Sequence, residues 1–141
     1  MGVNNMNYEK LRQFRNSHNN FAEFLGLEIT EIGPGYARAK MPVRKEFRNP
    51  IGSVHGGCIF TLADAAGCSA ASSYGYHITT ISSNLNFLNP GINTNILYAT
   101  TREIKRGKKI LVYDVSVTDE NDILLAEGIF SFMSLNKLIE L

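Results

Sequence analysis

The sequence is poor in several features that would point to a particular class of protein. Its 141 residues include no tryptophan and only two cysteines, and the formal net charge is +1. A charge so close to neutral gives no reason to expect a nucleic acid or an anionic membrane as a partner. No apolar run occurs in the first twenty residues, so we expect neither a signal peptide nor a membrane span there.

The two cysteines, Cys58 and Cys68, fall within one predicted helix. Ten residues of helix correspond to about 15 Å along the axis, which is too far for a disulfide. We therefore expect two reduced thiols, as is typical of a cytoplasmic protein. With 44% hydrophobic and 19% charged residues, the chain has the composition of a single domain with its own core.

Hydrophobic periodicity divides the chain into helical and extended segments, and clusters of Gly, Pro, Asn and Asp mark the turns between them. The predicted helices cover 6–25, with a point of interruption at Asn19 and Asn20, and 55–74, and the predicted strands cover 26–32, 36–43, 78–88, 95–105, 109–118 and 123–134. The turn spacing of the last four strands indicates an antiparallel meander. We predict an α+β fold in which one antiparallel sheet curls around a central helix. Residues 1–25 form an N-terminal helical segment and 26–141 the single domain.

The predicted helix at 55–74 is rich in small residues and lacks the Lys and Glu stripe of a surface helix, so we expect it to be buried. Its one carboxylate, Asp64, stands among Leu62, Ala63 and Ala65. A buried carboxylate is costly unless it has a partner or a chemical task. A helix-to-loop hydrogen bond would be the ordinary partner. The apolar surroundings favour catalysis instead, with Asp64 as general base on water or as nucleophile on a carbonyl, and the sequence leaves both roles open.

The same helix begins at His55, Gly56 and Gly57. The first N–H groups of a helix have no intrahelical acceptor, and the helix dipole adds partial positive charge, so this end can bind a carbonyl oxygen or an oxyanion. Glycine is also used where two backbones approach closely, and that alternative stays open. Together with Asp64, this helix start predicts acyl chemistry.

The spacing of Gly56 and Asp64 places a constraint on any shared site. Eight residues of helix span about 12 Å, whereas reacting groups must come within about 3 Å of each other. If both residues act on one substrate, two antiparallel helices from different subunits must meet. We therefore predict a homo-oligomer, a dimer or a dimer of dimers, with two active sites shared across each two-fold interface.

The stretch from Asn49 to Asp64, NPIGSVHGGCIFTLAD, resembles the hotdog-fold acyl-CoA thioesterases of the phenylacetate-degradation type, whose helix opens with N-x-x-G-x-x-H-G-G and later carries the catalytic Asp. The resemblance covers roughly residues 20–135. It implies a hotdog fold, an acyl-CoA substrate, Asp64 as the catalytic carboxylate and Gly56 as the donor that polarises the carbonyl. It also implies that Asn49 holds the attacking water or the carbonyl, and that His55 orders the loop.

A second match lies in the strand TISSNLNFLNP, which resembles the family pattern T/S-x-x-x-x-I-x-F-L-x-P. The resemblance implies that the Thr80 hydroxyl orients the catalytic carboxylate or the water, with Ser82 and Ser83 as competitors on the same strand. The ordinary alternatives are a packing role for Thr80 and a turn role for Asn49.

A basic turn at 105–109 holds four of the fourteen Lys and Arg residues. It is either a solvated hairpin tip or a contact to the phosphates of coenzyme A. The turn is too short, and too poor in aromatic residues, for nucleic-acid binding. Arg106 and Lys108, together with His55 and Gly57, are therefore the candidate substrate-binding residues. We expect no cofactor and no metal site, since the histidines lack ligand-spaced partners.

Two other functions are alternatives to thioester hydrolysis. A hotdog hydratase or dehydratase would use a His and an acidic residue as an acid–base pair on the acyl chain, and the H-G-G placement does not match that pattern. A non-catalytic acyl-CoA-binding hotdog domain would bind the thioester without releasing thiol. We rank an acyl-CoA thioesterase first.

Overall fold

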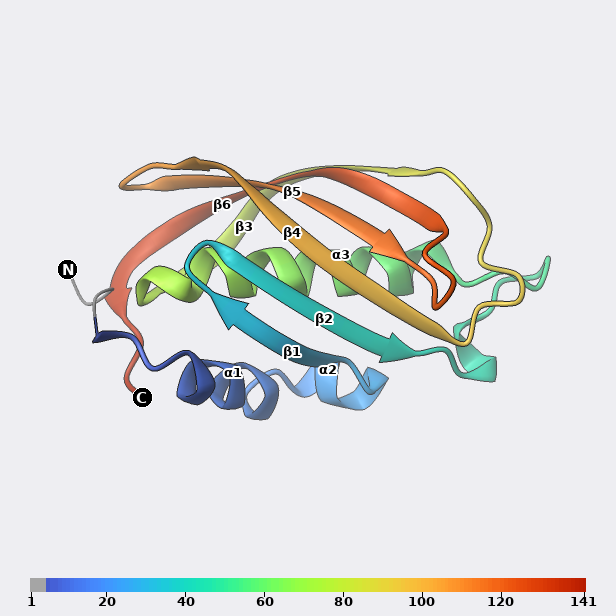
Figure 1. Cartoon of the computed structure of the whole chain (residues 1–141), viewed down its shortest axis with the longest axis horizontal. Helices are drawn as coiled ribbons and strands as arrows, with labels where there is room; N and C mark the ends of the chain where they lie inside the picture. The colour runs from blue at the N-terminus through green and yellow to red at the C-terminus, as the bar shows by residue number, and fades with distance from the viewer. Residues whose placement is uncertain (1–4) are drawn as a thin grey trace.

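Six antiparallel strands form one sheet that curls around the long helix α3 (Figure 1). The computed structural model describes residues 5–141. Its elements are α1 (Tyr8–Ser17), α2 (Asn20–Leu25), β1 (Glu28–Gly33), β2 (Tyr36–Pro42), η2 (Lys45–Phe47), α3 (Gly56–Ala71), η3 (Ser72–Tyr74), β3 (Tyr76–Phe87), β4 (Ile96–Arg106), β5 (Ile110–Thr118) and β6 (Leu124–Leu138). The predicted α+β architecture, a curled antiparallel sheet around a central helix, is confirmed. Within the described range no helix is both long and apolar enough to cross a membrane.

The order of the strands corrects the predicted meander. Strands β4, β5 and β6 do follow one another, but β3 pairs with β6 and β2 pairs with β4, which gives the order β1-β2-β4-β5-β6-β3. The connection at 88–95 is longer than a hairpin turn and carries the chain away from β3. Arg48 fixes this connection by donating hydrogen bonds to three of its carbonyl oxygens, those of Gly91, Ile92 and Thr94. Strands β1 and β3 are consequently the two edges of the sheet.

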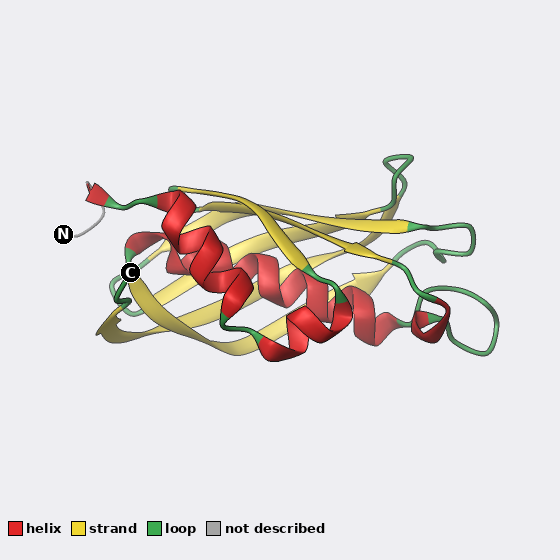
Figure 2. Cartoon of the chain, turned by 90° about the horizontal axis from the view of Figure 1, so that it is seen from below, coloured by secondary structure: helices red, strands yellow, loops and turns green. Residues whose placement is uncertain are grey.

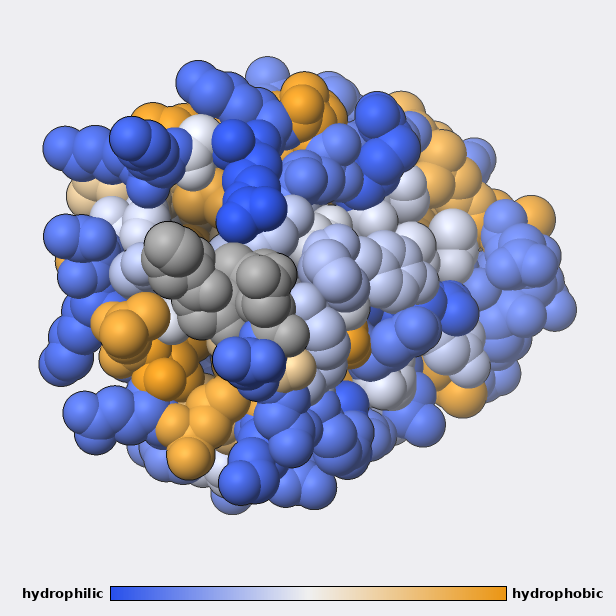
Figure 3. Space-filling model, turned by 60° about the vertical axis from the view of Figure 1, so that its left-hand side comes forward, coloured by the Kyte–Doolittle hydropathy of each residue, from blue (hydrophilic) through white to orange (hydrophobic). Residues whose placement is uncertain are grey.

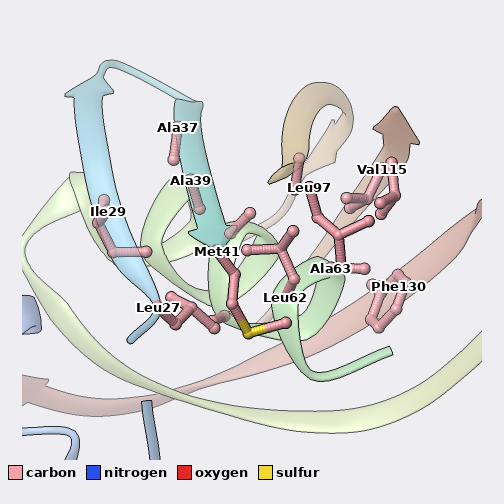
Figure 4. Packing of buried hydrophobic residues seen from close by; sticks show 14 of the residues in the cluster. Leu27, Ile29, Ala37, Ala39, Met41, Leu62, Ala63, Leu97, Val115 and Phe130 are labelled. Carbon is pink, nitrogen blue, oxygen red and sulfur yellow. The ribbon is translucent and has the colours of Figure 1, made fainter. Parts of the chain in front are cut away.

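Small side chains allow α3 to lie very close to the sheet. Ala63, Ala66 and Ala70 are completely buried. At Gly67 an added Cβ would stand 2.8 Å from the ring of Phe132 in β6, so a larger residue there would require this buried ring to move. Figure 4 shows the helix side chains surrounded by apolar side chains of the strands. The alanine-rich composition therefore reflects close packing of a central helix, as the sequence indicated.

The N-terminal segment covers the open side of the curled sheet, where α1 and α2 lie in front of α3 (Figure 2). Asn16 of α1 attaches to the edge strand β1, since its Oδ1 accepts the Ile29 N–H at 2.8 Å and its Nδ2 donates to the Ile29 carbonyl at 3.0 Å. The interruption expected between two N-terminal helices is confirmed. Asn19 begins the second helix by accepting the Ala22 N–H at 3.1 Å.

Candidate active site

The carboxylate of Asp64 projects from the middle of α3 toward strand β3. Thr80 Oγ1 donates a hydrogen bond of 2.7 Å to Asp64 Oδ1. Burial raises the pKa of Asp64 above its ordinary value, and the hydrogen bond from Thr80 and the positive charge of Arg15 oppose part of that rise. Asp64 is therefore a more basic carboxylate than a solvated aspartate, held in one orientation by a neutral donor.

The partner of Asp64 is decided by the register of β3. Thr80 lies opposite Phe132 of β6, and the register shifts between Thr80 and Ser82. Neither Ser82 nor Ser83 makes a side-chain hydrogen bond to Asp64 in the part of the chain that the structure describes. Of the three hydroxyls that the sequence offered, the structure brings the Thr80 hydroxyl to the carboxylate.

At the start of α3 the imidazole of His55 caps the helix. Its Nδ1 accepts the Gly57 N–H at 2.8 Å, so that N–H is already occupied. An added Cβ at Gly57 would stand 2.9 Å from the same nitrogen, which accounts for glycine there. The Gly56 N–H has no acceptor among residues 5–141, so of the two glycines Gly56 is the one with a free donor.

Asn49 lies in the same hollow as Gly56. This hollow has a volume of about 290 Å³ and is also lined by Phe87 and the 88–91 segment. The Asn49 side chain organises its own loop, because Oδ1 accepts the N–H groups of Ile51 and Ser53 at 3.1 Å and Nδ2 donates to Ser53 Oγ at 2.7 Å. One Nδ2 hydrogen is left for a water or a carbonyl.

Within one chain the two halves of the candidate site stay apart. Gly56 and Asp64 lie on the continuous helix α3, so about 12 Å of axis separates them. Asp64 does not line the hollow at Gly56. The edge strand β3 between them presents large apolar side chains to solvent, with Ile81 exposed by 49% and Phe87 by 55%.

The basic turn lies beyond the other end of α3. Arg106 and Lys108 line a hollow of about 420 Å³ together with Tyr74 and Ala71, the last residue of the helix. Gly56 is therefore about 22 Å away along the same helix. The surface toward this end of the molecule is mostly hydrophilic with separate apolar patches (Figure 3).

A polar cluster supports that basic turn. The guanidinium of Arg106 lies 3.5 Å from the centre of the Tyr74 ring. The hydroxyls of Tyr74 and Tyr113 both donate to Glu103 Oε1, at 2.7 and 2.9 Å. Burial and the hydrogen bond to Glu103 raise the pKa of Tyr74 to about 12. Arg106 is thus stacked in place, which differs from a freely solvated hairpin tip.

Sequence reasoning missed Arg15. This residue of α1 donates from Nε to Ser69 Oγ of α3 at 3.1 Å, and its charge opposes the rise in the pKa of Asp64. Nothing in the sequence pattern distinguishes Arg15 from the other polar residues of an amphipathic helix. Its position depends on how α1 crosses α3, which is a tertiary feature.

The geometry defines a class of chemistry. A carboxylate with a raised pKa and a fixed orientation can take a proton from water or attack a carbonyl, and a free N–H at a helix start can bind a developing oxyanion. Both groups are half-buried, next to the edge strand β3.

The comparisons with known proteins agree with this class. Residues 51–126 match the model of the thioesterase superfamily. The acyl-coenzyme A thioesterase PaaI of Escherichia coli is 32% identical over 105 residues, which cover 74% of this chain and 75% of that protein. The chain belongs to the thioesterase superfamily and is a thioester hydrolase with the hotdog fold.

Solved structures show the same relationship. The PaaI protein from the phenylacetic acid degradation operon of E. coli superposes with a TM-score of 0.88 at 26% identity, covering 94% of this chain and 96% of that one. A thioesterase from Haemophilus influenzae gives a TM-score of 0.82 at 27% identity, covering 96% and 94%. The family resemblance carried by the Asn49 to Asp64 stretch is confirmed.

Proposed function

We propose that this protein hydrolyses a coenzyme A thioester to a free acid and coenzyme A. The observation that carries the proposal is the carboxylate of Asp64, half-buried on α3 and held by Thr80 at 2.7 Å. The similarity to an acyl-coenzyme A thioesterase supports acyl-CoA as the substrate class.

In the proposed reaction, Asp64 either deprotonates a water that attacks the thioester carbonyl or attacks the carbonyl itself. In both cases the C–S bond breaks and coenzyme A leaves as the thiol; direct attack gives a mixed anhydride that a water then hydrolyses to the free acid. Thr80 orients the carboxylate in both cases. The free N–H of Gly56 donates a hydrogen bond to the carbonyl oxygen as negative charge develops on it, and one donor of this kind accelerates such a reaction by about 10²–10³. Asn49 lies beside Gly56 and can hold the water or the carbonyl with its remaining N–H. His55 fixes the loop by binding Gly57, so we assign these two residues to shaping the substrate-binding end of the helix.

We further propose that each site is shared between two subunits. The separation of about 12 Å between Gly56 and Asp64 supports this, because one thioester carbonyl cannot reach both within a chain. The apolar side chains exposed on β3 also support a shared site. An edge strand has backbone groups that can pair with a second strand, and burying its exposed apolar side chains against a partner would be favourable. A two-fold axis beside β3 would bring Gly56 of one subunit toward Asp64 of the other and create two sites per dimer. Arg106 and Lys108 would then bind the phosphates of coenzyme A.

A thiol-release assay over a panel of acyl-CoA thioesters tests the proposed hydrolysis. The Asp64→Asn variant should lose at least about 100-fold in rate while still folding, because a general base or nucleophile is removed. Asp122→Asn is the matched control. Asp122 is an exposed residue of the turn between β5 and β6, so this substitution should leave the rate unchanged. Equal rates in Asp64→Asn and wild type would remove Asp64 from the mechanism.

The same assay distinguishes the two other functions. A non-catalytic acyl-CoA-binding domain would bind the thioester in a calorimeter and release no thiol above background. A hydratase would release no thiol but would change the absorbance of an enoyl-CoA. Either result would overturn the proposed hydrolysis.

A further inference from the structure

A separate hollow lies between the N-terminal helices and the start of β3. It has a volume of about 350 Å³ and is lined by Phe14, Arg15, His18, Asn19, Asn20 and His77. Five of these six side chains can form hydrogen bonds. The motif from Asn49 to Asp64 contributes no residue to it. The hollow is therefore a feature of the N-terminal segment and the first residues of β3.

The hollow contains a guanidinium without an ionic partner. Arg15 is half-buried, and its Nε donates to Ser69 Oγ at 3.1 Å. None of the four ion pairs within residues 5–141 includes Arg15. Besides Ser69, the guanidinium interacts only with the weakly accepting thiol of Cys68 in that range, and no oxygen atom there accepts from its terminal NH₂ groups. A partly buried guanidinium with a free fork of donors is suited to a planar oxyanion such as a carboxylate.

The position of Arg15 relative to Asp64 indicates which part of a substrate would reach it. Arg15 is attached to α3 at Ser69, five residues or about 7.5 Å along the helix from Asp64. In agreement with this position, its charge opposes the rise in pKa that burial causes at Asp64 and at Cys68. Cys68 is one helical turn from Asp64, about 6 Å along α3. A group at Arg15 is thus a short distance from the reacting carbonyl. The phosphates of coenzyme A are separated from the thioester by the whole pantetheine arm, whereas the far end of a short acyl chain is not.

We propose that this hollow binds the acyl group and that Arg15 selects an acyl group ending in a carboxylate. The preferred substrates are then coenzyme A monothioesters of short dicarboxylic acids. This inference rests on the proposed thioester hydrolysis, and it adds the substrate class. The amides of Asn19 and Asn20 and the imidazole of His77 supply further hydrogen bonds, and Phe14 packs against the methylene chain.

The test compares two thioesters of equal chain length, adipoyl-CoA and hexanoyl-CoA, which differ only in the terminal carboxylate. Wild type should show a kcat/KM about tenfold higher for adipoyl-CoA, as expected for one charge-assisted pair. Arg15→Met should bring the ratio to about one, mainly by lowering kcat/KM for adipoyl-CoA, and Arg15→Lys should keep part of the preference. Arg12→Met is the matched control, because Arg12 lies on the same helix but does not line the hollow.

Three outcomes would overturn the inference. One is a wild-type ratio of one or below. Another is an equal loss of rate for both thioesters in Arg15→Met, which would mean that Arg15 acts only through Asp64. The third is an effect of Arg15→Met on coenzyme A thioesters that disappears in pantetheine thioesters, which lack the nucleotide; this would assign Arg15 to a phosphate.

A binding measurement keeps this inference distinguishable from the proposed hydrolysis. Asp64→Asn should bind adipoyl-CoA about tenfold more tightly than hexanoyl-CoA in a calorimeter, and Asp64→Asn/Arg15→Met should bind the two equally. If wild type hydrolyses neither thioester but this preference is present, the hydrolysis fails and the acyl selectivity stands. If wild type hydrolyses both and the binding preference is absent, the selectivity fails and the hydrolysis stands.

Discussion

Thr80 Oγ1 and Asp64 Oδ1 are joined by a hydrogen bond of 2.7 Å that connects the edge strand to the central helix. The bond lowers the pKa of a carboxyl whose burial raises it. It therefore sets both the orientation and the basicity of the candidate catalytic group, and substitutions at Thr80 can separate these effects from the loss of the carboxylate itself.

Thr80→Val removes the hydroxyl while keeping the shape of an exposed strand residue. We expect the pKa of Asp64 to rise further and the hydrolysis rate to fall about tenfold, the scale of a hydrogen bond to a charged group. The pH–rate profile should show the acid limb moving to higher pH. Thr80→Ser, which retains a hydroxyl, should behave like wild type. An unshifted profile in Thr80→Val would mean that the hydrogen bond has no influence on the reaction.

The pH dependence of wild type follows from the direction of the Asp64 shift. Hydrolysis requires the ionised carboxylate, so kcat/KM should fall on the acid side with an apparent pKa above the ordinary 3.8. An acid limb at or below that value would contradict the inferred burial effect.

The contribution of Asp64 to stability should fall as pH rises, whereas the activity should increase. Because the folded protein binds the Asp64 proton more tightly than the unfolded chain does, the contribution of this group to stability decreases as pH rises from 3.8 through the raised pKa. Thermal unfolding of wild type and Asp64→Asn across that range should show the variant gaining relative stability with increasing pH. A constant difference would show that the pKa of Asp64 is the same in the folded and unfolded states.

Removing charge from the basic turn tests its role in substrate binding. Arg106→Ala combined with Lys108→Ala should raise KM for acyl-CoA thioesters and leave kcat unchanged, because a phosphate contact is equally strong in ground and transition states. Acyl thioesters without the nucleotide should be hydrolysed as by wild type. If both substrates are affected equally, the turn does not contact the phosphates.

Mixed dimers test the shared site. Gly56→Pro removes the donor N–H at the first helical position, where proline is well tolerated, and the preceding His55 has φ −60° and ψ 132°, which suits a following proline. Chains with Gly56→Pro and chains with Asp64→Asn should each be inactive alone. Random mixing should restore about a quarter of wild-type activity, since half of the dimers are mixed and each regains one of its two sites.

Size measurements must first show that both variants form dimers and exchange subunits. Gly56→Ala is the control for added bulk. It keeps the N–H, and like proline it adds a Cβ, which would lie 3.2 Å from the Phe87 ring. No recovery in verified mixed dimers would place each site within one chain.

The fold could be predicted where local pattern decides it. The alternation of apolar and polar residues predicted the strands, and the alanine-rich stretch without Lys or Glu predicted that α3 is the central helix. Both patterns follow directly from which faces of an element are buried. The pairing of β3 with β6 could not be predicted, since it depends on the path of the 88–95 connection, whose carbonyl oxygens Arg48 binds. Turn spacing carries no information about which distant strand becomes the neighbour.

The candidate site was predictable to a similar extent. Asp64 and Gly56 could be found because a carboxylate among alanines and a glycine pair at a helix start are both locally unusual. The capping bond from Gly57 to His55 and the attachment of Arg15 to Ser69 could not, because each depends on side-chain orientation in the folded chain. The Thr80 assignment relied on the family resemblance, and the register of β3 supplies its physical reason.

The attachment of Asn16 to Ile29 has a consequence for how copies of this chain can combine. Its amide supplies the edge strand β1 with the same pair of bonds that a neighbouring strand would supply at that residue. A sheet open at both margins can add partners without limit, as fibrils do. Here the helix that carries Arg15 occupies part of one margin, so we expect association through the other margin to stop at a pair of chains.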